Sequence, residues 1–112
     1  MYSCLILGHN LKRATIFLEL LKKANRDKVV VNTQTNFVTY DQHIFVAYGI
    51  SKPEDLIFIR GRRVDYVFID DDLKYVDYYH DVRVGALCAT HSHSVGNFMY
   101  FDLDKLIKGG LI

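Results

Sequence analysis

The sequence has few of the residues that break or cross-link a chain. One of its 112 residues is proline and two are cysteine, whereas half are hydrophobic. A chain of this size and composition buries well over half of its unfolded surface, so residues 1–112 are expected to form a single domain. Cys4 and Cys88 stand far apart within apolar runs. This placement argues against a disulfide framework and indicates buried free thiols in a reducing compartment.

An excess of charge and long apolar runs are also missing. The 14 Lys and Arg nearly balance 13 Asp and Glu, so no global basic field drives nonspecific binding to nucleic acid. No apolar stretch reaches the roughly twenty residues that a membrane span needs, and no basic segment followed by a cleavable apolar stretch opens the chain. We therefore expect a cytoplasmic protein without membrane contact, in which any contact with nucleic acid is local.

The order of the apolar runs that are present predicts an α/β fold. The run YSCLILG, residues 2–8, predicts a buried parallel strand, and residues 28–33 predict a second one. The helical spacing between them predicts a helix with Asn10 as its N-cap. Its apolar stripe consists of Ala14, Phe17, Leu18, Leu21 and Ala24. A strand, helix and strand in this order favour a right-handed crossover and parallel pairing.

Runs rich in β-branched and aromatic residues predict five further strands. They cover residues 43–49, 56–61, 64–70, 82–90 and 97–103. The remaining helices are predicted over residues 72–81 and in the tail 102–110, which Gly109 and Gly110 would end. The expected fold is a single α/β domain with a mainly parallel sheet flanked by few helices. So few helices would leave one face of the sheet thinly covered or occupied by a partner.

The stretch VFIDD, residues 67–71, places carboxylates at the end of a predicted strand. Ligands of open α/β sheets bind beyond the carboxyl ends of the strands, where Gly8 and the start of the first helix would also lie. The stretch matches the Walker B pattern, in which the first carboxylate holds Mg²⁺ and the second polarises the attacking water. Under this hypothesis Asp70 binds the metal and Asp71 is catalytic. The alternative is an aspartate that only caps the next helix.

Three motifs occur in an order that resembles one family. GHNLKRAT, residues 8–15, has the spacing of a P-loop, with Thr15 in place of the Mg²⁺-ligating hydroxyl. RGRRVDYVFIDD, residues 60–71, resembles the segment leading into the Walker B strand of phage large-terminase ATPases and related viral helicase-like proteins. GALCATHSHSVGNFMYFDL, residues 85–103, resembles the coupling motif of the same family.

This resemblance covers residues 2–105 and implies a phage-encoded protein with a RecA-like P-loop sheet. It implies Mg²⁺ and ATP as cofactors, with Thr15 and Asp70 as metal ligands and Asp71 as the catalytic residue. The nucleotide contacts that it implies are Gly8, Thr15 and Thr90. Lys12 and Arg13 are added as candidates, because they would reach a phosphate from a shifted position at the helix N-terminus.

The departures from the family pattern point to lost activity. Arg13 stands where a P-loop has its second glycine, and Ala14 stands where it has lysine. Glycine lets the backbone N–H groups face the phosphates, and lysine neutralises the phosphate charge. We therefore expect a degenerate P-loop protein that binds a protein partner or nucleic acid, with little or no NTP hydrolysis. The alternative is a minimal Mg²⁺-dependent ATPase related to DNA-packaging terminases, with Lys12 or Arg13 replacing the lysine.

The densest basic run is RGRR, with Arg60, Arg62 and Arg63. Guanidinium groups suit a phosphate backbone or an acidic protein surface, so these residues are candidates for contact with nucleic acid or a partner. Terminase-like ATPases work as rings in which a neighbour's arginine completes the site, and these arginines would serve that role in a homo-oligomer. The alternative is a solvated turn between strands.

The histidines suggest a third function. His91 and His93 would share one face of an extended strand, and with His80 and the carboxylates of residues 70–72 they would form a mixed metal site. Such a site is typical of a metal-dependent phosphoesterase or nuclease. The alternative is a polar loop with solvated imidazoles, because the spacing is not that of a defined zinc motif.

Overall fold

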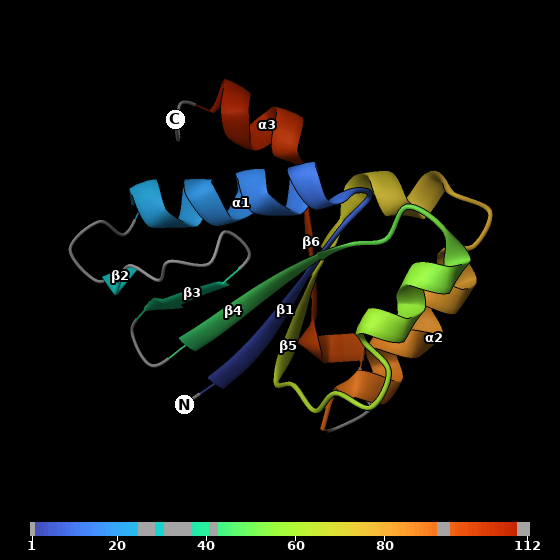
Figure 1. Cartoon of the computed structure of the whole chain (residues 1–112). Helices are drawn as coiled ribbons and strands as arrows, with labels where there is room; N and C mark the ends of the chain where they lie inside the picture. The colour runs from blue at the N-terminus through green and yellow to red at the C-terminus, as the bar shows by residue number, and fades with distance from the viewer. Residues whose placement is uncertain (1, 25–28, 31–36, 41–42, 92–94, 110–112) are drawn as a thin grey trace.

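The computed structural model describes residues 2–24, 29–30, 37–40, 43–91 and 95–109, which form one sheet with helices on both of its faces (Figure 1). The strands of the described part are Tyr2–Gly8 (β1), Val29–Val30 (β2), Phe37–Tyr40 (β3), His43–Gly49 (β4), Tyr66–Asp70 (β5) and Phe98–Phe101 (β6). The α-helices there are Leu11–Ala24 (α1), Tyr79–Ala89 (α2) and Leu103–Lys108 (α3). The 3₁₀ helices are Pro53–Phe58 (η1), Asp71–Tyr75 (η2) and Val95–Asn97 (η3).

The sheet has the strand order β2-β3-β4-β1-β5-β6. Four of its six strands, β4, β1, β5 and β6, are parallel to one another. In contrast, β3 is antiparallel to β4, and β2 is antiparallel to β3. The chain is therefore a single α/β domain with a mainly parallel, RecA-like sheet flanked by few helices, as predicted. The predicted pairing of the first two strands was wrong: β2 runs in the same direction as β1, but β3 and β4 lie between them.

Hydrophobic cores lie on both faces of the sheet because β1 alternates its side chains between them. Cys4 and Ile6 pack in the core beneath α1, which also contains Leu103 at the start of α3. Leu5 and Leu7 pack in the opposite core with α2 and η2. Figure 1 shows α1 and α3 on one side of the sheet and α2 on the other. On the α2 side, the β4 residues Ile44, Val46 and Tyr48 are only half-buried.

Two segments predicted as strands are helical. Residues 56–61 include the end of η1, which has Pro53 at its first position and Glu54 and Asp55 in its first turn, all favourable at a helix start. Residues 82–90 lie almost wholly in α2, where Val82, Ala86 and Ala89 are buried. Their spacing of four and three residues places them on one helical face. The β-branched residues at positions 82 and 84 therefore gave a misleading strand signal.

Other local predictions hold. Arg13 N–H donates to Asn10 Oδ1 over 2.9 Å, which confirms the N-cap of α1, and α3 ends at Gly109. Cys4 is buried, whereas Cys88 is exposed, so the predicted burial of the second thiol was wrong. Over the described ranges, no helix combines the length and the apolar composition that crossing a membrane requires.

Candidate functional site

The carboxyl ends of the parallel strands meet at one edge of the sheet. Gly8 pairs with Gly49, and Asp70 pairs with Phe101. Only two residues separate the end of β1 at Gly8 from the start of α1 at Leu11. A Cβ on Gly49 would lie 2.1 Å from the backbone nitrogen of Leu11, so only glycine allows this approach of β4 to α1. The turn at the P-loop position is therefore short and tightly packed.

Asp70 is fully buried at this edge, and donors from its own chain surround its carboxylate. Oδ2 accepts from Arg13 Nε at 2.6 Å and from the N–H of His9 at 3.1 Å. Oδ1 accepts from Arg13 Nη2 at 3.1 Å and from the N–H of Asp72 at 3.1 Å, which also makes Asp70 the N-cap of η2. Four donors match the roughly four acceptor sites of a carboxylate. A metal ion would therefore have to displace a donor to reach Asp70.

Arg13 joins the start of α1 to the carboxylates of residues 70–72, called the acidic cluster below. Its guanidinium binds Asp70 through two nitrogens and lies 3.3 Å from Asp72 Oδ2. The hydrogen bond to Asp70 raises the pKa of Arg13 above its ordinary value, so the guanidinium stays charged. The residue at the position of the second P-loop glycine thus places a cation against the predicted metal ligand.

The other predicted nucleotide and metal contacts are not gathered around Asp70. Lys12 is exposed on α1. The Thr15 hydroxyl donates to the Lys12 carbonyl over 2.9 Å. Thr15 lies two positions after Arg13 on α1, which corresponds to a rotation of about 200° about the helix axis. Because Arg13 faces Asp70, Thr15 faces away from it. Thr90 is buried, and its hydroxyl donates to the Leu87 carbonyl at the end of α2. In this arrangement the predicted residues do not fit a Mg²⁺–nucleotide complex.

Asp71, the predicted catalytic residue, lies at the surface of the cluster. Its Oδ1 atom is 2.8 Å from Lys74 Nζ, and a third of its side chain is exposed. The neighbouring carboxylate raises the pKa of Lys74. Asp71 is therefore one half of a partly exposed ion pair of the i,i+3 kind.

The histidines do not form a metal cluster in the described part of the chain. His80 is exposed on α2, and His91 Nε2 lies 4.0 Å from Asp65 Oδ1. His93 lies outside the described residues. Among the residues that are described, no group of three or more His, Cys, Asp or Glu side chains is placed to hold a metal ion.

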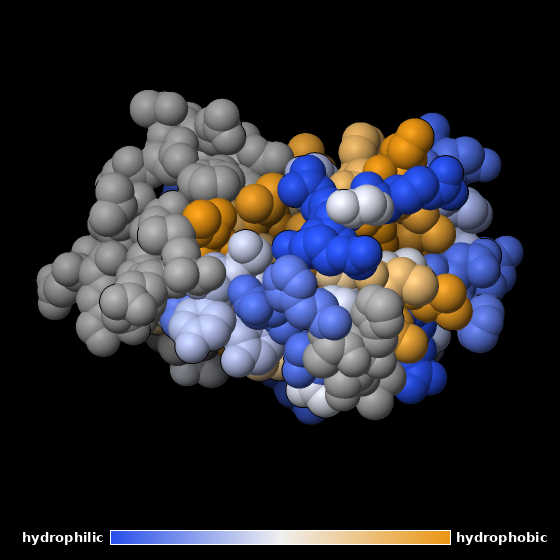
Figure 2. Space-filling view, turned by 90° about the horizontal axis from the view of Figure 1, so that it is seen from below, coloured by the Kyte–Doolittle hydropathy of each residue, from blue (hydrophilic) through white to orange (hydrophobic). Residues whose placement is uncertain are grey.

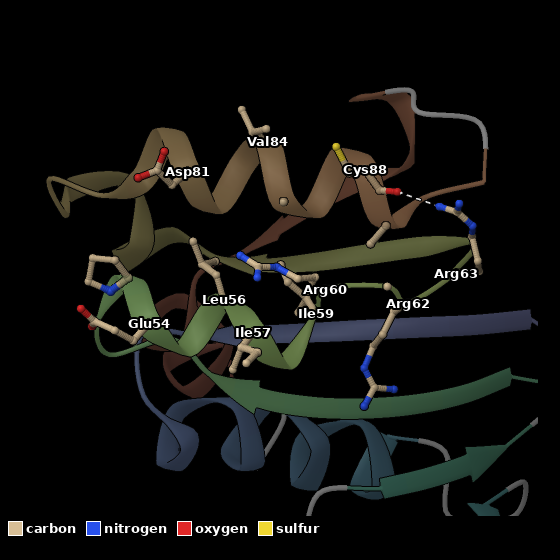
Figure 3. A pocket seen from close by; sticks show the side chains of 14 residues that line it. Glu54, Leu56, Ile57, Ile59, Arg60, Arg62, Arg63, Asp81, Val84 and Cys88 are labelled. Carbon is tan, nitrogen blue, oxygen red and sulfur yellow. Dashed lines mark hydrogen bonds between the residues drawn. The ribbon is translucent and has the colours of Figure 1, made fainter.

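The arginines of the RGRR run lie away from the acidic cluster. They follow η1 and precede β5, at the end of that strand opposite to Asp70. There they border a groove of about 830 Å³ between residues 53–63 and residues 81–89 of α2, called the η1–α2 groove below. Figure 3 shows Arg62 and Arg63 at one end of this groove, Glu54 and Asp81 at the other, and Val84 and Cys88 along α2.

Sequence reasoning singled out the arginines but missed the rest of the groove. Ile57 and Val84 are exposed on its walls, although both were assigned to predicted strands of a buried sheet. A helical assignment of residues 82–90 would have placed Val84 off the buried face formed by Val82, Ala86 and Ala89. The signals for it were the Pro-Glu-Asp sequence at residues 53–55 and the helical spacing of small apolar residues in 82–89.

Comparisons with protein-family models, with curated proteins and with solved structures find no match to this chain.

Proposed function

We propose that this chain acts by binding a macromolecular partner through the η1–α2 groove, with little or no nucleotide hydrolysis. The observation that carries the proposal is an apolar groove bordered by three arginines, none of which is ion-paired with a carboxylate among the described residues. Exposed apolar groups beside arginines are typical of surfaces that bind another macromolecule. The proposal includes a degenerate P-loop-like scaffold and a cytoplasmic location. The two free cysteines support the location, because disulfides are rare in the cytosol.

The contacts of Asp70 support the second half of the proposal. Catalysis of phosphoryl transfer needs a metal-binding carboxylate and a cradle of backbone donors. Here Arg13 and two backbone N–H groups already occupy the carboxylate, and a two-residue turn replaces the loop. The cluster then acts as a structural link between α1 and β5, and binding occurs elsewhere on the molecule.

Calorimetry with ATP and ADP in the presence of Mg²⁺ tests this half directly. We expect no binding heat up to millimolar nucleotide with the wild-type protein. Saturable binding that is weakened in Asp70→Asn, with turnover that is lost in Asp71→Asn, would instead establish the minimal ATPase. Lys23→Ala is the matched control, since Lys23 is an exposed lysine in the last turn of the same helix, at the end away from Arg13 and Asp70.

A further inference from the structure

We infer that the η1–α2 groove binds an extended or helical segment of a protein partner, with apolar side chains in the groove and carboxylates against Arg60 and Arg62. The inference rests on the proposed function and names the chemistry of its partner. It is carried by an apolar wall, by a prearranged guanidinium and by a difference in charge between the two ends of the groove (Figure 3).

The walls of the groove are apolar and accessible. Ile57 on η1 is 63% exposed and Val84 on α2 is 45% exposed. Buried Ile59 lies between η1 and α2. If Gly85 carried a Cβ atom, that atom would lie only 3.1 Å from Ile59 Cδ1, so α2 packs closely on the segment that contains Ile59. Figure 2 shows hydrophobic and strongly hydrophilic groups side by side on the face seen from below. Such a mixture of apolar and arginine surface is typical of protein–protein interfaces.

Arg62 is held in place before any partner binds. Its Nε donates to the carbonyl of Phe58 over 2.8 Å, and its guanidinium lies 4.7 Å from the centroid of the Tyr48 ring, whose hydroxyl it also contacts. Tyr48 is in turn stacked on Phe58. A guanidinium fixed in this way loses little conformational entropy when it binds a carboxylate. Arg62 is therefore suited to anchor an acidic group.

Arg63 and Arg60 have different roles in the groove. Arg63 Nη1 donates to the carbonyl of Cys88 over 3.1 Å, at the negative end of the α2 dipole, so its position is explained by the fold. Arg60 is exposed and extends between the two walls of the groove (Figure 3). Among the described ion pairs, none involves Arg60. Arg60 is thus the guanidinium most available to a partner.

The opposite end of the groove favours a protein over a nucleic acid. Glu54 and Asp81 line that end. A phosphate backbone that runs along the groove would bring its charges against these two carboxylates, whereas a peptide can present an acidic residue to one end and a basic residue to the other. The formal net charge of +1 supplies no overall basic field to offset the repulsion.

A random peptide library displayed on phage and selected against the full chain tests the inference. We expect the selected peptides to carry apolar residues next to Asp or Glu. Synthetic copies should shift the amide NMR signals of residues 53–63 and 81–89. Arg60→Glu and Ile57→Asp should each weaken their binding roughly tenfold or more in fluorescence anisotropy. A peptide with Lys in place of its carboxylate should regain binding to Arg60→Glu.

Matched controls are available on α3. Lys108→Glu makes the same charge change as Arg60→Glu, and Ile107→Asp makes the same change as Ile57→Asp at a comparably exposed site. Both variants should bind the peptides like wild type. A circular dichroism spectrum of each variant shows whether it is folded before its binding is measured.

The other outcomes separate this inference from the proposed function. Selected peptides without acidic residues, or binding unaffected by Arg60→Glu, would overturn the inference. A single-stranded DNA 20-mer that shifts the groove signals when no peptide does would overturn it and leave the proposed function intact. If neither peptide nor DNA affects the groove, both proposals fail.

Discussion

At the scale of single residues, Arg13 determines the surroundings of Asp70, the predicted metal ligand. A glycine at position 13 would leave space and backbone donors near the carboxylate, whereas Arg13 fills the position with two hydrogen bonds to Asp70. A buried carboxylate needs such partners, because an unpaired charge in the interior costs several kcal/mol. The ion pair is therefore an element of the fold.

Arg13→Ala should lower the free energy of unfolding by about 3 kcal/mol, because it leaves the carboxylate of Asp70 buried without its cation. Urea denaturation followed by circular dichroism measures the change. Lys12→Ala, one position away and exposed, should change stability by less than about 0.5 kcal/mol. In the double variant Arg13→Ala with Asp70→Asn, the loss should be smaller than the sum of the two single losses. Additive losses would show that the two side chains do not act as a pair.

The two cysteines should differ in reactivity. Burial raises the pKa of Cys4 to about 12, from an ordinary value of 9.0, so its reactive thiolate is scarce at pH 8. A thiol reagent such as DTNB should modify the exposed Cys88 in the folded protein and reach Cys4 only after denaturation. The variant Cys88→Ser should show no reaction until it unfolds. Fast reaction of this variant would mean that Cys4 is accessible.

The same shift gives a pH dependence of stability. Below pH 9 the Cys4 thiol is protonated in both the folded and the unfolded chain. Between pH 9 and about 12 the unfolded thiol ionises first, so the free energy of unfolding should fall as the pH rises. Tyr79, whose pKa burial raises to about 12, acts in the same direction above pH 10. Urea titrations at pH 8 and pH 10.5, with Cys4→Ala as the comparison, measure the contribution of the thiol.

The sequence predicted the location of Asp70 but not its partner. The apolar run before it and the carboxyl-edge rule place it opposite the start of α1, and the contact with His9 N–H agrees. The bond from Arg13 depends on the rotation of α1 about its axis and on the length of the preceding turn. The position of α1 also involves the close approach of Gly49 to Leu11, which lie 38 positions apart in the sequence and show no local signal of it.

At the scale of elements, hydrophobicity identified core segments better than it identified their geometry. β1, β4, β5 and β6 lie within predicted strands, and α1 and α3 within predicted helices. The segments at 56–61 and 82–90 were misassigned because short apolar runs are compatible with both geometries, and packing against the sheet decides between them. The order of the strands, with β3 and β4 beside β1, depends on contacts between distant residues.

Gly49→Ala should be strongly destabilising, by at least about 3 kcal/mol, because its methyl group would meet the backbone of α1, which cannot move aside as a side chain can. Gly61→Ala is an informative comparison: its φ of +79° disfavours alanine, but no atom lies within 4 Å of the new methyl group. We expect a cost of about 1 kcal/mol there. Thermal denaturation of both variants measures the difference, and equal costs would contradict the close approach.

At the scale of the whole molecule, the two cores share the central strand. β1 contributes Ile6 to one core and Leu7 to the other. Loss of either core would therefore expose half of the same strand. Unfolding should be a single cooperative transition, with coincident curves from far-UV circular dichroism and tyrosine fluorescence. Two separated midpoints would mean that the α1 and α2 layers unfold independently.

The central position of β1 also affects how the chain acquires its structure during synthesis. Tyr2 pairs with His43, and Cys4 pairs with Tyr66, so β1 leaves the ribosome before both of the strands that flank it in the sheet. Until they emerge, its apolar residues have no sheet to join. Folding that depends on such distant contacts is slow compared with helix formation, and its intermediates expose hydrophobic surface that is prone to aggregation. The nascent chain is therefore most prone to aggregation before β5 is complete.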